Sequence, residues 1–217
     1  MKCLSDLGIM WSVFWEMKDR YMKQYKILGI VLSAALLCGC GASSKAPEVS
    51  EIELAKDGKI VSTLVDSFDQ DYYDLAELQK LIDEEVAEYR TLYGEEAISA
   101  GEATLEDGIV RVCITYADAD DYNRFNDRNL FVGTVGDALN EGYSFGTVFH
   151  AVSDDEESIN SDNIAEHSDL NVIITDEPGR YRINGKIRYI SDDVVTESSK
   201  AAMISADMEG LCYILYK

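Results

Sequence analysis

The sequence is poor in positive charge, proline and histidine. Its 217 residues include 19 lysines and arginines against 41 aspartates and glutamates, with two prolines and two histidines. The scarcity of cations argues against a nucleic-acid-binding protein, because phosphate backbones repel a strongly negative body. It also argues against docking on anionic lipid through a basic face.

The other shortages limit the architecture and the cofactors. Two prolines and the lack of a second long linker favour a single folded domain. With two histidines and no Cys-x-x-Cys after residue 40, the composition argues against a zinc site. We therefore expect no metal and no other cofactor.

The only long hydrophobic run is too short to cross a membrane. Lys23 and Lys26 precede the eleven residues 27–37, which only Gly29 and Ser33 interrupt. A short basic stretch followed by such a run is typical of a secretory signal, whereas a spanning helix needs about 20 apolar residues. Residues 22–39 are therefore predicted to be a signal peptide.

The end of this run, Leu37-Cys38-Gly39-Cys40, resembles the lipobox of bacterial lipoproteins. The resemblance implies that the sulfur of Cys40 carries diacylglycerol and that Cys40 is the first mature residue. Cys38 departs from the usual Ala or Ser, although its size fits. The alternative is a buried helix that happens to end in cysteines. The expected location is the outer face of the cell membrane, because two acyl chains hold a protein stably.

Residues 1–21 do not fit the export signal, because they mix tryptophans with acidic residues. One hypothesis is that translation starts at Met22; the alternative is an amphipathic helix at the membrane interface. After Cys40, residues 40–50 are small and polar and predict a flexible tether. Residues 51–217 are predicted to form one domain.

The mature chain, residues 40–217, carries 14 basic and 38 acidic residues, a net charge of −24. This charge keeps an exported protein soluble. An affinity for cations or for a basic partner is the alternative interpretation.

Local patterns predict the first elements of the domain. Asp57-Gly58 lies between two apolar runs and predicts a hairpin with a two-residue turn. Asp74, with Glu77 three residues later, begins a long amphipathic helix over about residues 74–93, which Gly94 ends. Apolar and polar residues then alternate over 109–117, as in a half-buried strand.

The remainder is predicted from weaker signals. Residues 118–128 form a short helix or turn, 130–135 a strand, 137–141 a helix, 143–152 a strand and 153–169 an acidic loop without a buried face. Five later strands are predicted, at 170–175, 180–183, 186–190, 201–206 and 211–216, with turns at Glu177-Pro178-Gly179, at Asn184-Gly185 and through 207–210. These elements predict an α+β fold, a mostly antiparallel sheet with the long helix packed on one face.

One serine motif suggests hydrolysis. Gly142-Tyr143-Ser144-Phe145-Gly146 fits the Gly-x-Ser-x-Gly pattern of a nucleophile on a strand-to-helix turn. The residues that follow favour a strand instead, and only His150 and His167 could serve as the base. Ser144, His150 and His167 are therefore weak catalytic candidates.

Two further sets of residues are candidates for a cation site and for a disulfide. Asp118, Asp120 and Asp121 lie in a cluster of oxygen ligands that could hold a cation weakly, although the EF-hand order fails. The alternative is a solvated loop or helix cap. Cys113 and Cys212 are the thiols left besides Cys40, and they are either a disulfide or two free thiols.

Much of the sequence after residue 60 resembles the single domain of uncharacterised lipoproteins from Gram-positive, clostridia-like bacteria. The segments that carry the resemblance are residues 60–81, Asp121-Tyr122-Asn123-Arg124-Phe125-Asn126, residues 133–135 and Gly142-Tyr143-Ser144-Phe145. This resemblance brings no known activity. The sequence therefore predicts a non-enzymatic, lipid-anchored domain that binds an envelope protein or a small ligand. The alternatives are an envelope hydrolase using Ser144 and an accessory ligand-binding protein of a transporter.

Overall fold

The computed structural model of the protein describes residues 47–153 and 157–217. The predicted signal peptide and Cys40 lie outside these residues. In the described part, strands predominate over three α-helices, and the strands form two mainly antiparallel sheets. This confirms the α+β class and the antiparallel character predicted from the sequence.

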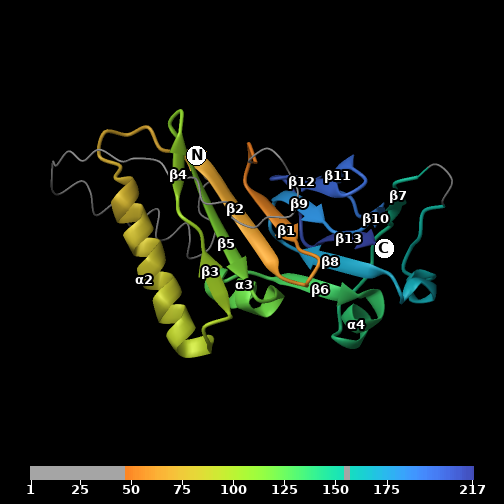
Figure 1. Ribbon diagram of the computed structural model, residues 1–217. Coiled ribbons are helices and arrows are strands. Elements are labelled where there is room, and N and C mark those ends of the chain that lie inside the picture. Colours follow the sequence, from red (N-terminus) through yellow and green to blue (C-terminus); the bar gives the residue numbers. More distant parts are fainter. Residues whose placement is uncertain (1–46, 154–156) are drawn as a thin grey trace.

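The larger sheet, sheet A, contains eight strands (Figure 1). In spatial order it runs β11 (Val194–Ser198), β12 (Ala201–Ile204), β9 (Gly179–Ile183), β1 (Glu51–Leu54), β2 (Ile60–Ser67), β5 (Ile109–Tyr116) and β3 (Ile98–Ala100), and β4 (Thr104–Glu106) also pairs with β5. Among the described strands, β1 and β9 form a parallel pair and all other pairs are antiparallel.

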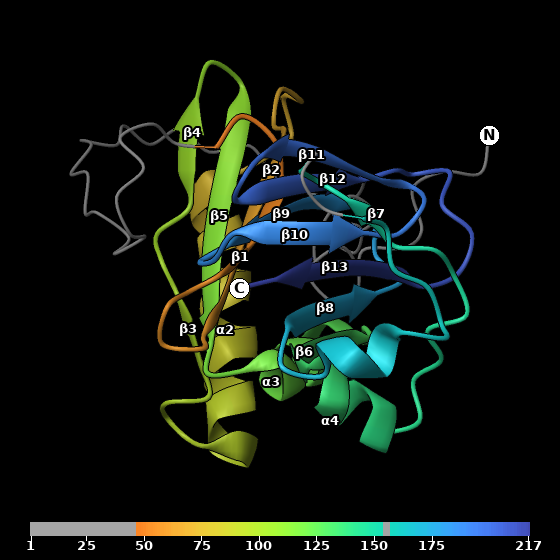
Figure 2. The same cartoon turned by 90° about the vertical axis from the view of Figure 1, so that its right-hand side faces the viewer.

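The smaller sheet, sheet B, contains five strands. Its order is β6 (Leu130–Thr134), β8 (Asn171–Thr175), β13 (Cys212–Tyr216), β10 (Ile187–Ile190) and β7 (His150–Ala151). All five residues of β13 are buried, which fits its central position. Figure 2 shows sheet B lying beside the β9 and β12 part of sheet A.

The helices are α2 (Leu75–Tyr93), α3 (Ala119–Asn126) and α4 (Val135–Asn140), and a 3-10 turn, η1, covers Ile164–His167. The α2 helix runs alongside the half of sheet A that contains β4 and β5 (Figures 1 and 2). It begins where the Asp74 carboxylate accepts hydrogen bonds from two backbone amides, and it ends at Gly94. Its buried side chains are Leu78, Ile82, Val86 and Tyr89.

Two apolar clusters make up the core. The larger joins one face of sheet A to α2, α3 and one face of sheet B, through residues such as Ile114, Phe125 and Ile214. The smaller lies on the opposite face of sheet B and includes Val135 of α4 and Ile164 of η1. The opposite face of sheet A, here called the outer face, carries the alternate residues of its strands.

The elements predicted from local signals are present. β1 and β2 form the expected hairpin, and the predicted alternation along β5 is seen, with every second side chain buried from Val110 to Tyr116. The hairpin turn differs in length from the prediction. Gly58 N–H donates to the Ala55 carbonyl and Ala55 N–H to that of Lys59, so three residues, with Gly58 at φ 87°, form the turn.

The predicted pairing of the later strands is wrong. Asn184-Gly185 does not close a hairpin, because β9 belongs to sheet A and β10 to sheet B. Likewise β12 pairs with β11 and β9, while β13 pairs with β8 and β10. The connections at 184–186 and 205–211 therefore carry the chain from one sheet to the other. In these two sheets the strands bury their apolar side chains in a shared cluster, as Ile183 of β9 and Ile187 of β10 do.

Two segments between α4 and β8 also differ from expectation. The predicted strand over 143–152 is reduced to His150–Ala151, together with a bridge between Phe149 and Ile159. The predicted acidic loop without a buried face does have one, because Ile159 and Ile164 belong to the smaller cluster. These two isoleucines are apolar residues of the segment that pack against sheet B.

Candidate functional site

The outer face of sheet A carries a group of ion pairs between β1 and β9. The parallel register places Glu51 opposite Arg180 and Glu53 opposite Arg182. Arg182 donates to both carboxylate oxygens of Glu51, from Nε at 2.9 Å and from Nη2 at 3.0 Å. The Glu51 side chain is only 3% exposed, so this forked pair is shielded from water and holds the arginine in one orientation.

A second arginine extends this arrangement toward the sheet edge. Arg180 Nη1 lies 3.4 Å from Glu51 Oε2, and its Nε lies 2.7 Å from Glu197 of β11. Hydrogen bonds to Glu51 on the neighbouring strand thus hold the Arg182 guanidinium, whereas Arg180 is placed by ion pairs with Glu51 and with Glu197, two strands away. Fixed guanidinium groups make a preorganised surface, because little side-chain entropy remains to be lost when a ligand binds.

A cleft of about 510 Å³ opens beside these arginines. The ends of β1 and β9 and the turn between β11 and β12 form its walls, and its lining includes Glu53, Lys56, Arg180, Arg182, Asn184 and Lys200. Its volume falls in the range of small-molecule sites. Four cations line this one cleft of a chain whose net charge is −22.

The two lysines of the cleft differ from its arginines in having no acidic partner. Within residues 47–153 and 157–217, no carboxylate lies within ion-pair distance of Lys56 or Lys200. Lys59, in the same turn as Lys56, does have a partner, because its Nζ lies 3.7 Å from Asp57. The cleft therefore offers two uncompensated positive charges.

Among the described residues, Glu53 is the one acidic residue that lines the cleft. Its side chain is half-buried, and no hydrogen bond or ion pair within 4.0 Å reaches its carboxylate from the described residues. Burial raises the pKa of this carboxyl, Arg182 opposes the rise, and Glu51 adds to it. Glu53 is thus an acceptor without a donor.

No local sequence motif predicts this cleft. Its residues come from three segments, 53–56, 180–184 and 198–201, which the parallel pairing of β1 with β9 brings together. A signal was present in the alternation Glu51-x-Glu53 and Arg180-x-Arg182, which places opposite charges on one face of two strands. No local pattern says that these two strands are neighbours.

Ser144 lies in a second, more open cavity of about 400 Å³, together with Asp192 and Glu209. It is exposed, but it follows α4 and precedes β7, the reverse of the strand-to-helix order that a nucleophile elbow needs. His150 Nε2 lies 2.9 Å from Asp192, so an acid and an imidazole do meet.

The serine and the histidines are not joined. Within the described residues no hydrogen bond links the Ser144 hydroxyl to His150 or to His167. Tyr213, whose hydroxyl donates to the Ser144 carbonyl, faces the smaller cluster. His150 pairs with Ile190, whose side chain packs on the larger cluster, so strand alternation directs His150 to the other face of sheet B. His167 packs against the Tyr189 ring.

The aspartates considered for a cation have other partners. Asp118 caps α3, and its carboxylate accepts a hydrogen bond from the Asp121 backbone. The Asp121 side chain accepts from the Tyr89 hydroxyl at 2.9 Å and pairs with Arg124 at 3.0 Å, while Asp120 is exposed in the first turn. Within the described chain, no three acidic, histidine or cysteine side chains form a group that could hold a metal ion.

Cys113 and Cys212 are not joined to each other by a disulfide. Cys212 belongs to the larger cluster, and its burial raises the pKa of its thiol to about 11. Cys113 lies on β5 between Val112 and Ile114, which point into that cluster, so its own side chain points to the outer face. A disulfide between them would require one strand to turn over.

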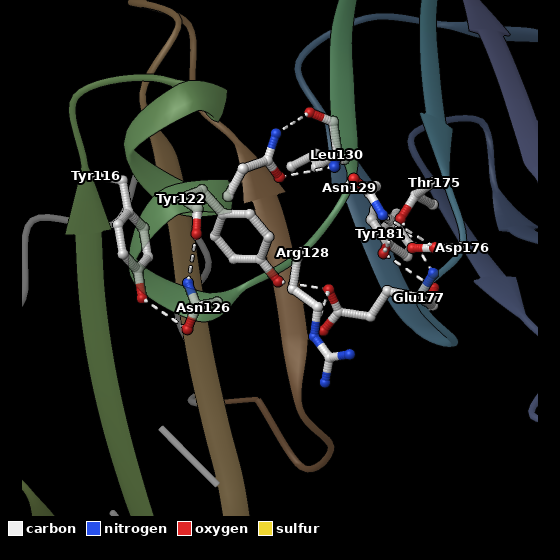
Figure 3. A network of polar contacts seen from close by, with 11 residues as sticks. Tyr116, Tyr122, Asn126, Arg128, Asn129, Leu130, Thr175, Asp176, Glu177 and Tyr181 are labelled. Atoms are coloured by element: carbon white, nitrogen blue, oxygen red, sulfur yellow. Dashed lines mark hydrogen bonds and ion pairs between the residues drawn. The ribbon is translucent and has the colours of Figure 1, made fainter. Parts of the chain in front are cut away.

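A buried polar network lies where α3 meets the turn between β8 and β9 (Figure 3). Tyr122 donates to Glu177 at 2.7 Å, Arg128 Nε lies 3.8 Å from the same carboxylate, and the Tyr181 hydroxyl donates to the Glu177 carbonyl. Burial raises the pKa of Glu177, although Tyr122 and Arg128 oppose the rise. No cavity described above opens onto this network, so we assign it a structural role.

Comparison with protein families, curated proteins and solved structures finds no match for this chain. Among the helices in the described residues, none combines the length and the apolar character needed to span a bilayer.

Proposed function

We propose that the protein is a lipid-anchored lipoprotein domain on the outer face of the cell membrane, and that it binds an anionic group in the cleft between β1, β9 and the β11–β12 turn. The anion belongs to a small ligand or to an envelope protein. In this proposal the domain is not an enzyme, and the long amphipathic helix α2 serves only to cover sheet A.

The observation that supports the binding proposal is that Lys56 and Lys200, which have no acidic partner among the described residues, lie beside Arg180 and Arg182. A lysine ammonium group in a partly enclosed site attracts a carboxylate or phosphate group. The attraction is stronger where the nearby carboxylates of the protein already pair with other cations and do not compete for the lysine. Glu51 and Glu197 are engaged in this way with Arg180 and Arg182. Because the net charge over residues 40–217 is −24, the protein as a whole does not attract anions at long range. Binding of an anion therefore depends on its direct contacts with the lysines and arginines of the cleft.

The proposed location at the outer face of the membrane depends on the lipobox resemblance at Cys40. In Triton X-114 partition, the mature protein from the native host should enter the detergent phase, and Cys40→Ala should move to the aqueous phase, because two acyl chains provide the anchor. Cys38→Ala serves as the matched control, since alanine is common at that position and should leave lipidation intact. Equal partition of wild type and Cys40→Ala would contradict the anchor.

The cleft is tested by titrating the detergent-solubilised mature protein with propyl phosphate and with pentanoate, followed by calorimetry. We expect binding, and we expect Lys56→Ala and Lys200→Ala each to weaken it by about fivefold, somewhat less than a fully buried charged hydrogen bond is worth. Lys59→Ala is the control in the same turn and should bind as wild type does. Unchanged affinity in both cleft variants would refute the site.

The two alternatives have less support. A hydrolase using Ser144 draws only on the exposure of that serine beside Asp192 in the second cavity. An accessory protein of a transporter would favour two lobes around a cleft, whereas the larger apolar cluster here contains residues of both sheets.

A further inference from the structure

The cleft contains both kinds of uncompensated charge. Within residues 47–153 and 157–217, the exposed Lys56 and Lys200 have no acidic partner and the half-buried Glu53 has no donor. All three line the same cavity, yet neither lysine forms an ion pair with the Glu53 carboxylate within 4.0 Å. Complementary charges that share a cavity and do not pair with each other are each open to an external partner.

The chemistry of each side follows from this arrangement. An anionic group would bind at the lysines, as argued above for the cleft. A second anionic group would be repelled by Glu53, whereas an ammonium group would give its carboxylate the charge-assisted hydrogen bonds it lacks. Arg182 attracts the Glu53 carboxylate electrostatically, but the two hydrogen bonds given above go from its Nε and Nη2 to Glu51.

The lining also restricts the rest of the ligand. It offers Asn184 and Ser198 as polar groups and Ala55, Ile183 and Ala201 as aliphatic ones, and no aromatic side chain of the described residues lines the cavity. A flat aromatic ligand would find no stacking partner there. A short, flexible, polar molecule with charges at its two ends fits these walls.

We infer that the ligand of this cleft is a small zwitterion, with its phosphate or carboxylate at Lys56 and Lys200 and its ammonium group at Glu53. This inference rests on the proposed function, since it names the chemical class of ligand for the same cleft. The shared chemistry is an anion and an amine a few bonds apart, whether the anion is a phosphate or a carboxylate.

Matched probes separate the two ends of the ligand. Phosphoethanolamine and propyl phosphate differ only in having an ammonium or a methyl group at the end, and 4-aminobutyrate and pentanoate differ in the same way. We expect wild type to bind the zwitterion of at least one pair about tenfold more tightly, the factor typical of one added charged hydrogen bond. In Glu53→Gln this preference should fall to about one, while propyl phosphate and pentanoate bind no more weakly than in wild type.

The outcomes distinguish the inference from the proposed function. If the anionic probes bind and depend on Lys56 and Lys200, but wild type shows no preference for either zwitterion, the inference fails and the anion site stands. A preference that survives in Glu53→Gln also defeats the inference. If none of the four probes binds, the proposed function fails and the inference fails with it. Should Glu53→Gln not fold, the wild-type ratios decide alone.

Discussion

At the scale of single residues, the described structure separates the roles of three carboxylates that look alike in the sequence. Glu51 is buried and held by two arginines, Glu177 is buried and held by Tyr122, and Glu53 is half-buried with no donor. All three glutamates lie near other acidic residues in the sequence. Only the hydrogen-bond and ion-pair partners seen in the structure distinguish a structural glutamate from one that could bind a ligand. Glu177 provides a direct test of the supporting role.

Replacing Glu177 with Ala should destabilise the protein by about 2–4 kcal/mol, because the Tyr122 hydroxyl and the Arg128 guanidinium lose their acceptor in a buried site. Glu177→Gln keeps an acceptor for Tyr122 and should cost less. Urea denaturation with circular dichroism measures both. Equal stability of the Ala variant and wild type would show that the network contributes nothing.

The same glutamate should also make stability depend on pH. Because the folded pKa of Glu177 is raised, the native state holds this proton more tightly than the unfolded state does. The resulting stability is fully present below the unfolded pKa of about 4.5 and is lost as pH rises through the folded pKa. The free energy of unfolding of wild type, minus that of Glu177→Gln, should therefore decrease from pH 4.5 to pH 7. An increase would reverse the assigned direction.

At the scale of elements, local signals identified what local interactions decide. The carboxylate of Asp74 starts α2, the alternation in β5 follows its buried face, and Gly58 turns the first hairpin. The hairpin between β4 and β5 was missed although Asp107-Gly108, both with positive φ, carries the usual signal. Asn184-Gly185 carries an equally good signal, yet the chain crosses there between sheets.

The close packing of Gly185 against the end of β13, at the point where the chain crosses between the sheets, can be tested by substitution. A Cβ at this position would lie 2.7 Å from Cδ2 of the buried Tyr216 ring, in the central strand β13 of sheet B, and 3.1 Å from the carbonyl oxygen of Lys217, the residue that follows β13. Gly185→Ala should therefore cost about 1–3 kcal/mol from overpacking. Gly146→Ala is the control, because its nearest contact is the Ser144 hydroxyl at 3.4 Å. Equal urea midpoints for the two variants would contradict this packing.

At the scale of the whole molecule, the sequence predicted the class but could not predict the site. The α+β content follows from periodicities that repeat within a few residues. The cleft needs β1 beside β9, more than 120 residues apart, and the turn before β12 at their ends. Pairing over that distance is decided by total burial and not by any one motif.

Net charge also acts at the scale of the whole molecule, and over residues 40–217 it is −24. A charge of −24 destabilises the compact state through self-repulsion, and salt screens exposed charges more than buried pairs such as Glu51 with Arg182. We therefore expect the melting temperature at pH 7 to rise between 10 mM and 150 mM sodium chloride. At pH 4.5, where many exposed carboxylates are protonated, the rise should be smaller. A fall with salt at pH 7 would mean that exposed ion pairs outweigh the repulsion, and an equal rise at both pH values would mean that salt acts through something other than carboxylate charge.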